Sequence, residues 1–289
     1  MTKRALWAFY DDQMTHHAAA LTYYALMSLF PTALVGLSLL GLLGQYPDTY
    51  VAITDYLEEV VPPSVIDPVD RSLRAALDSK ETALTALVVS IPLALYGTTG
   101  ALEAARRALN VAFELNGDGR SFLRRKTIDV GSTLVLMTLV LLSLVMVFVG
   151  GAFAEDLFGF AGLGPSATRV WSVARWPGAL VVAMLAFAFV YYVTPDVRHR
   201  AFHWLTPGAA VAVLLWLAAT LLFSAYVSSV VDVGAAYGAF GGAILLVVWL
   251  WLTNVALLFG AELNAEIERE KELAEGVPSG ETLNRPARG

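Results

Sequence analysis

The run AAYGAFGGAILLVVWLWLTNVALLFGAEL, residues 235–263, decides the fold of this chain. It carries no charge from Ala235 to Ala261, and about 20 apolar residues suffice for a helix to cross a bilayer. The run then continues without a break into Glu262 and a charged stretch that reaches Lys271. This pattern predicts one long helix that passes from a packed surface, through lipid, into water.

Small residues mark the start of this run. Gly234, Gly238 and Gly242 recur at every fourth position, which places them on one face of a helix. Bare backbone on such a face lets a second helix approach closely. We therefore expect Gly238 and Gly242 to pack against another helix of the same chain.

Five earlier apolar runs also have the length of membrane spans. Only 15% of the residues are charged, well below the roughly 25% of soluble domains. We predict an all-α integral membrane protein with one domain over residues 1–271, followed by a disordered cytoplasmic tail over residues 272–289. Its six transmembrane helices are expected at residues 18–44, 82–99, 130–151, 176–194, 202–229 and 235–263.

The distribution of Lys and Arg predicts the orientation. With six spans, fourteen of these bases fall on the side of both termini and five on the other side. We expect a multi-pass protein of the cytoplasmic membrane with both termini in the cytoplasm. The connection over residues 45–81 then faces outward. Its spacing of Ile53, Leu57 and Val60 predicts amphipathic helices in this extracytoplasmic loop.

Several segments match a family pattern. They are AAALTYYALMSLFP in span one, ALEAARRALN after span two, RRK before span three, YYVTPD at the end of span four, LTPGAAVAVLLW in span five and YGAFGGAILLVVWLWLTNVALLFGAELNAEIE at the end. In these segments the chain resembles the YihY/BrkB family of bacterial and archaeal inner-membrane proteins. The resemblance implies six helices and a role linked to envelope integrity, resistance to host killing and lipid handling.

The older family label ribonuclease BN is regarded as a misassignment, and the family has no agreed catalytic motif. Cysteine is absent, which excludes thiolate catalysis and Cys-ligated metal sites. His199 and His203 have the spacing to share a metal ion, but their neighbours Arg198 and Arg200 favour a place among lipid headgroups. We predict no catalytic residue, no metal and no cofactor, no nucleic-acid partner, and a protein that is not an enzyme.

A few polar residues lie inside the expected spans. Tyr23, Tyr24, Ser28 and Asn254 are candidates for a substrate or lipid site, and plain packing or helix-to-helix hydrogen bonding is the alternative for each. The prolines Pro31 and Pro92, which lie within spans, should kink their helices.

The expected cytoplasmic ends of the spans carry a basic rim. It consists of Arg106, Arg107, Arg124 and Arg125, which could meet anionic headgroups at about 1 kcal/mol per base. Glu262 could pair with Arg106 or Arg107 and close the inner end of the bundle, and separate solvated charges are the alternative.

These features favour the handling or transport of lipid or another amphipathic substrate, with membrane lipids as partners. The first alternative is a non-transporting scaffold that docks an envelope protein, and the second is a membrane-bound hydrolase. A transporter predicts a polar cavity, a scaffold a solid core with an apolar outer patch, and a hydrolase converging ionisable groups. The sequence carries no signal for an oligomeric state.

Overall fold

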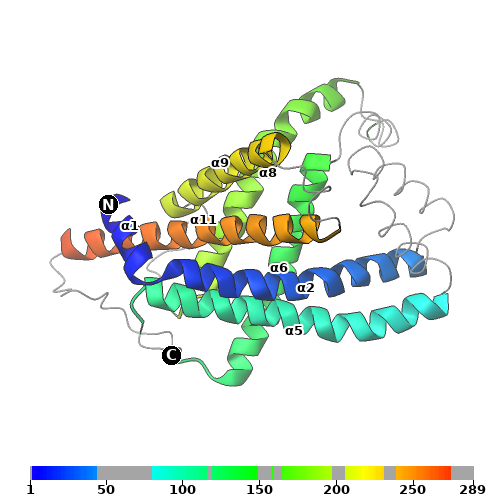
Figure 1. Cartoon of the computed structure of the whole chain (residues 1–289), viewed down its shortest axis with the longest axis horizontal. Coiled ribbons are helices and arrows are strands. Elements are labelled where there is room, and N and C mark those ends of the chain that lie inside the picture. The colour runs from blue at the N-terminus through cyan, green and yellow to red at the C-terminus, as the bar shows by residue number, and fades with distance from the viewer. Residues whose placement is uncertain are drawn as a thin grey trace. The chain divides into compact units, whose positions relative to one another are not determined.

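The computed structural model describes residues 2–43, 80–115, 119–148, 158, 165–196, 206–230 and 239–274, and all regular structure in these ranges is α-helical (Figure 1). The helices in these ranges are α1 (Thr2–Asp11), α2 (Met14–Leu43), α5 (Lys80–Ala112), α6 (Phe122–Phe148), α8 (Pro165–Val193), α9 (Pro207–Val230) and α11 (Ala239–Ala274). The predicted all-helical class is confirmed for the described chain.

Helix α11 is the long helix that the last apolar run predicts. Its 36 residues continue from the apolar stretch into the charged one without interruption. At a rise of 1.5 Å per residue such a helix is about 54 Å long, whereas the hydrocarbon core is about 30 Å thick. The helix is therefore long enough to cross a bilayer and still project well beyond it.

Helices α2 and α5 each contain one of the two prolines. Both helices run on through these positions, Pro31 and Pro92. Helix α5 also extends past the apolar part of its sequence as far as Ala112, which agrees with the expected continuation after span two. A short turn separates α1 from α2, and Gln13 there has a positive φ of 51°.

Two helices begin earlier than the sequence predicts. Helix α8 starts at Pro165, well before the expected span over residues 176–194. Proline is favoured at the first helical position, where no backbone N–H is needed. Helix α6 starts at Phe122 instead of residue 130, after Ser121, whose Oγ atom accepts a hydrogen bond from the Arg124 N–H at 3.4 Å. Hydropathy locates only the apolar part of each helix, so polar first turns were missed.

Four helices of the described chain are long and apolar enough to cross a membrane. These stretches are Leu84–Ala112, Ser166–Val193, Pro207–Val227 and Gly241–Lys271. Helices α2 and α6 lie at the other two expected spans, so the count of six crossings stays a prediction. Of the expected loop over residues 45–81 only residues 80 and 81 are described, and of the expected tail only residues 272–274 are described.

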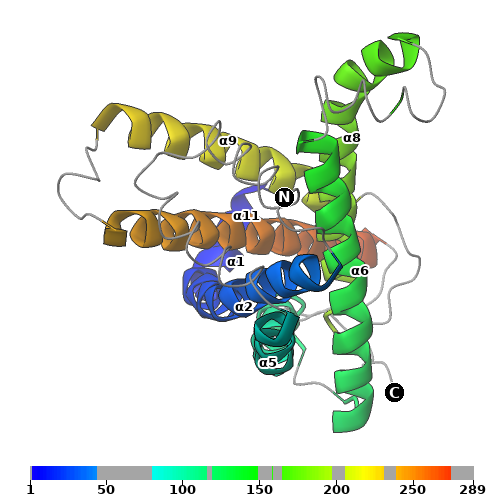
Figure 2. The ribbon, with the colours of Figure 1, turned by 90° about the vertical axis from the view of Figure 1, so that its right-hand side faces the viewer.

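The chain divides into two compact units. The first comprises Met1–Ala18, Leu102–Leu222 and Leu252–Gly289, and the second comprises Ala19–Ala101 and Phe223–Trp251. In the first unit, α1 lies beside the C-terminal part of α11 (Figure 1), where the rings of Phe9 and Phe259 are 6.0 Å apart. Helices α6 and α8 pack against each other in the same unit (Figure 2).

The C-terminal part of α11 is the centre of the first unit. Its buried residues point in every direction around the helix and include Ala256, Leu258, Ala261, Leu263 and Ala265. A helix that is buried on all sides needs neighbours on all sides. One neighbour is α8, whose Tyr191 hydroxyl donates a hydrogen bond to the Leu257 carbonyl at 2.6 Å.

Candidate functional site

A pocket of about 320 Å³ lies at the C-terminal end of α5 and collects three of the four rim arginines. We call it the arginine pocket. Its lining consists of Glu103, Arg106, Arg107, Asn110, Val111, Leu115 and Arg125. The fourth predicted residue, Arg124, lies exposed on α6 beside Arg125 and is not part of this lining. The structure therefore joins most of the predicted basic rim into one concave site.

The first of these arginines, Arg106, is held in place by a buried ion pair. Its Nη2 atom bonds Oδ1 of Asp129 on α6, and both side chains are at most 5% exposed. A buried charge costs several kcal/mol unless it is paired, so each partner fixes the other. This pair sets the position of α6 against α5.

The second arginine, Arg107, has a different environment. Its side chain is 74% exposed, and its Nη2 atom donates a hydrogen bond to Glu103 Oε1 at 2.7 Å, one turn earlier on α5. An exposed pair of this kind contributes only about 0.3–0.5 kcal/mol. Arg107 can therefore exchange Glu103 for another anion at little cost.

A second buried network fixes the end of α8 near this pocket. The Nε atom of Arg120 lies 3.5 Å from Oδ1 of Asp196, and its Nη2 atom donates a hydrogen bond to the Thr194 carbonyl at 2.9 Å. The backbone N–H of Asp196 donates to Oδ1 of Asn110 at 3.2 Å. The end of the YYVTPD segment is therefore held by an ion pair and hydrogen bonds to Arg120, which follows α5, and to Asn110 of α5.

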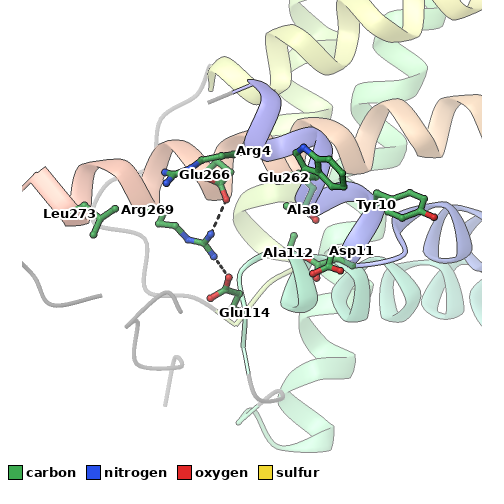
Figure 3. A pocket seen from close by; sticks show the side chains of 12 residues that line it. Arg4, Ala8, Tyr10, Asp11, Ala112, Glu114, Glu262, Glu266, Arg269 and Leu273 are labelled. Carbon is green, nitrogen blue, oxygen red and sulfur yellow. Dashed lines mark hydrogen bonds and ion pairs between the residues drawn. The ribbon is translucent and has the colours of Figure 1, made fainter. Parts of the chain in front are cut away.

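A larger cavity of about 650 Å³ lies between α1, the end of α5 and the C-terminal part of α11 (Figure 3). We call it the acidic cavity, because five carboxyl side chains line it: Asp11, Asp12, Glu114, Glu262 and Glu266. Two bases, Arg4 and Arg269, also line it. This cavity belongs entirely to the first unit.

The deepest group in the acidic cavity is Glu262, which is only 1% exposed. Its side chain hydrogen-bonds the side chain of Asp12, in the turn between α1 and α2. Burial raises the pKa of Asp12 above its usual value, and the hydrogen bond from Glu262 and the charge of Arg269 offset part of that rise. Burial in the same region lowers the pKa of His17.

The expected ion pair of Glu262 with Arg106 or Arg107 is wrong in its choice of partners. The structure pairs Arg106 with Asp129, pairs Arg107 with Glu103 and places Glu262 on Asp12. The reason is the rotation of α11 about its own axis, which turns Glu262 toward α1. The ion pairs at the C-terminal part of α11 are instead those of Arg269, which bonds both Glu266 and Glu114 (Figure 3).

Three of the predicted intramembrane candidates, Tyr23, Tyr24 and Ser28, lie in the second unit. A Cβ atom built on Gly97 of α5 would lie 2.7 Å from the Ser28 backbone, and one on Gly100 would overlap the Tyr24 ring. The Ser28 hydroxyl donates to the Ala25 carbonyl at 2.9 Å within its own helix. Tyr23 is exposed and meets Tyr24 edge to face at 5.2 Å. The choice between a lipid site and packing at these residues stays a prediction.

The predicted packing of the glycine face of α11 stays a prediction. A Cβ atom on Gly242 would meet nothing within 4 Å in the described part of the chain, and Gly238 lies outside the described residues. A close approach that the sequence analysis did not predict occurs between Gly260 of α11 and Gly208 of α9. The remaining candidate on α11, Asn254, is half-buried.

Sequence reasoning missed the acidic partners of the site, Asp12, Asp129 and Asp196. Each lies at the edge of an apolar run, where a charge is costly unless it is used. Their position beside an apolar run was the sequence signal that could have identified these acids. Within the described ranges no cluster of three or more metal-binding side chains occurs, and His199 and His203 lie outside those ranges.

Comparison with known proteins gives a match over almost the whole chain. The family described as virulence factor BrkB matches residues 5–284. The ribonuclease-like protein YfkH of Bacillus subtilis (strain 168) is 27% identical over 261 residues, which cover 90% of this chain and 92% of the relative.

Two further relatives have names that mention only a membrane. A UPF0761 membrane protein of Pseudoalteromonas translucida (strain TAC 125) is 28% identical over 90% of this chain and 83% of its own length. A UPF0761 membrane protein of Xanthomonas campestris pv. campestris (strain B100) is 25% identical over 90% of this chain, which corresponds to 59% of that longer protein. No solved structure matches the chain.

Proposed function

The chain belongs to the virulence factor BrkB family of membrane proteins, and from that premise we propose that it binds anionic lipid headgroups through the arginine pocket. In this proposal it is a multi-pass protein of the cytoplasmic membrane that handles or transports lipid or another amphiphile in the cell envelope. Both termini lie in the cytoplasm, as the distribution of bases predicts.

The observation that carries the proposal is the convergence of Arg106, Arg107 and Arg125 on one pocket. Its volume of about 320 Å³ falls at the lower end of the range of small-molecule sites. Guanidinium groups bind phosphate oxygens in a fork geometry with two parallel hydrogen bonds. A phosphate headgroup is therefore the ligand that this lining favours.

The three arginines of the pocket have different roles in the proposed binding of the headgroup. Arg106 is held in its ion pair with Asp129 and contributes a positive charge at a fixed position. Arg107 is held only by its exposed pair with Glu103, so a phosphate can replace the carboxylate. Arg125, in the first turn of α6, is half-buried beside them. Arg107 and Arg125 are thus expected to make the direct contacts.

Acyl chains have an apolar path beside the pocket. Val111 lines it and is 36% exposed, while Phe122 and Leu123 at the start of α6 are largely exposed. Exposed apolar side chains on membrane-length helices are stabilised by contact with lipid tails. An anionic phospholipid could therefore place its headgroup among the arginines and its tails along this surface.

The test measures binding of phosphatidylglycerol to delipidated protein in detergent. We expect the variant with Arg107→Gln and Arg125→Gln to bind at least about tenfold more weakly, because two charge-assisted contacts are lost. Arg124→Gln is the control for the α6 position, since it removes one charge from the same turn of α6 outside the pocket. Equal weakening of lipid binding in both variants would show that binding depends on overall positive charge and not on the pocket. No binding above that of an unrelated membrane protein would favour the scaffold.

The hydrolase alternative has a separate test. We expect RNA to stay intact when it is incubated with the purified protein and added divalent metal. Metal-dependent cleavage that survives stringent purification and disappears in His199→Ala would overturn the lipid proposal and assign an enzyme.

A further inference from the structure

The acidic cavity contains two buried carboxylate oxygens that point to a ligand. Oε1 of Glu262 and Oε2 of Glu266 have no hydrogen-bond partner in the described part of the chain. Both residues line the cavity, and they are only 1% and 4% exposed. Buried polar groups are almost always satisfied. Two such oxygens in one cavity therefore call for a hydrogen-bond donor that enters it.

The balance of charge in the cavity indicates which donor fits. Five carboxyl groups face two arginines, and Arg269 already spans Glu266 and Glu114 (Figure 3). Arg269 thus shows how a nitrogen cation is received at one end of the cavity. At the other end, Glu262 and Asp12 hydrogen-bond each other, and the charge of Arg269 acts on Asp12 from its ion pairs with Glu266 and Glu114.

Metal ions fit this lining poorly. The described residues contain no group of three or more side chains placed to hold one metal ion. The carboxylates instead line a space of about 650 Å³, which is large enough for an organic molecule. Trp7 and Tyr10 of α1 also face it, and aromatic rings attract organic cations.

We propose that the acidic cavity is a binding site for a primary ammonium group, received by Glu262, Asp12 and Glu266 between α1 and α11. The N–H donors of the ammonium satisfy the two orphan carboxylate oxygens, and its charge balances the excess of acids. The bound group bridges α1 to α11 and so holds the N-terminal helix against the first unit. This site is separate from the arginine pocket and takes a ligand of opposite charge.

Binding should also release a proton. Two carboxyl groups that hydrogen-bond each other hold one proton between them, because two carboxylates would repel. The charged groups that face Asp12 are Asp11 of α1, His17 of α2, and Glu262 and Arg269 of α11. An ammonium ion that donates to both carboxylates replaces the shared proton, which leaves to the buffer.

The first arm of the test uses a free diamine. Purified protein in detergent is titrated with 1,4-diaminobutane by calorimetry, in two buffers of different ionisation enthalpy at equal ionic strength. We expect saturable binding with proton release, and at least about tenfold weaker binding in Glu262→Gln and in Glu266→Gln. Glu270→Gln is the matched control, because it removes a carboxylate one turn further along α11 outside the cavity lining. Its binding should change by less than about twofold.

The second arm asks whether the ammonium belongs to a lipid. The protein is placed in nanodiscs of phosphatidylcholine with or without phosphatidylethanolamine, whose headgroups differ in having or lacking N–H donors. Stabilisation by phosphatidylethanolamine that is lost in Glu262→Gln identifies a lipid headgroup as the source. Binding of the diamine without this lipid effect identifies a soluble amine.

The proposal is overturned if the wild-type protein responds to neither probe, or if Glu262→Gln and Glu266→Gln bind as the wild type does. If Glu262→Gln does not fold, Glu266→Gln alone decides, because Glu266 lines the same cavity and also has an orphan oxygen. The arginine-pocket variants should leave diamine binding unchanged. Failure here and failure of the lipid proposal are therefore separate results.

Discussion

Asn264 of α11 caps the first turn of α9 by binding Gly208. Its Oδ1 atom accepts a hydrogen bond from the Gly208 N–H at 2.9 Å, and its Nδ2 atom donates to the Thr206 hydroxyl at 3.0 Å. The Thr206 Oγ1 atom in turn accepts a hydrogen bond from the Ala209 N–H at 3.1 Å. A residue from a distant helix thus satisfies backbone donors that a helix start leaves without partners.

Asn264→Ala is expected to destabilise the protein by about 1–2 kcal/mol, the usual loss for a helix cap. The measurement is the free energy of unfolding in mixed detergent micelles. Asn264→Asp keeps the oxygen that accepts from Gly208, and we expect it to lose less than Asn264→Ala. An alanine variant as stable as the wild type would show that the cap contributes nothing.

The crossing of α9 and α11 at Gly208 and Gly260 leaves no room for a side chain. A Cβ atom on Gly260 would lie 2.5 Å from the Tyr191 hydroxyl oxygen and 2.7 Å from the Ala212 Cβ atom. Gly260→Ala should therefore cost about 1–3 kcal/mol through overpacking. Gly242→Ala on the same helix has open space among the described residues and should be neutral or gain up to about 1 kcal/mol from helix propensity. Reversal of this order would contradict the observed crossing.

The buried pair of Arg106 and Asp129 is expected to act as a coupled unit. Asp129→Asn leaves a buried arginine without its charge partner and should cost about 3–5 kcal/mol. In a double-mutant cycle the loss should shrink when Arg106→Gln is already present. Glu262→Gln serves as the comparison, because its hydrogen bond is to Asp12, and its effect should add to that of Arg106→Gln. Strong coupling between Glu262 and Arg106 would support the ion pair expected from the sequence and contradict the partners seen in the structure.

The sequence predicts more of the helices than of the contacts between side chains. The continuous forms of α5 and α11 follow from composition, because good helix-forming residues carry each apolar run into its charged end. The first turns of α6 and α8 could not be found this way, since hydropathy reports contact with lipid and not helix length. At the site, the grouping of Arg106, Arg107 and Arg125 followed from their place past the spans. The partners of Arg106 and Glu262 depend on how each helix is rotated, which tertiary packing decides.

Orientation in the membrane is the fourth prediction. Reporter fusions after residues 60, 118, 165, 200 and 289 should read outside, inside, outside, inside and inside, because fourteen of the bases then face the cytoplasm. Enzymatic reporters that work on only one side of the membrane provide the measurement. A cytoplasmic signal at residue 60 would reverse the first hairpin and contradict the topology.

The last prediction concerns pH and the attachment of α1. Burial raises the pKa of Asp12 above its ordinary value of 3.8, so the folded state holds its proton more tightly than the unfolded chain does. The stability linked to this group is fully present below that ordinary value and is lost as pH rises through the higher pKa of the folded state. Asp12→Asn removes this titration.

We therefore expect the difference in melting temperature between Asp12→Asn and the wild type to move in favour of the variant as pH rises from about 4 to about 8. Thermal unfolding in detergent measures it, and Asp11→Asn, an exposed neighbour at the end of α1, is the matched control. The charges that face Asp12, those of Asp11, His17, Glu262 and Arg269, stay in place in the variant. A pH-independent difference would mean that Asp12 keeps its charge throughout, and that no proton is shared with Glu262.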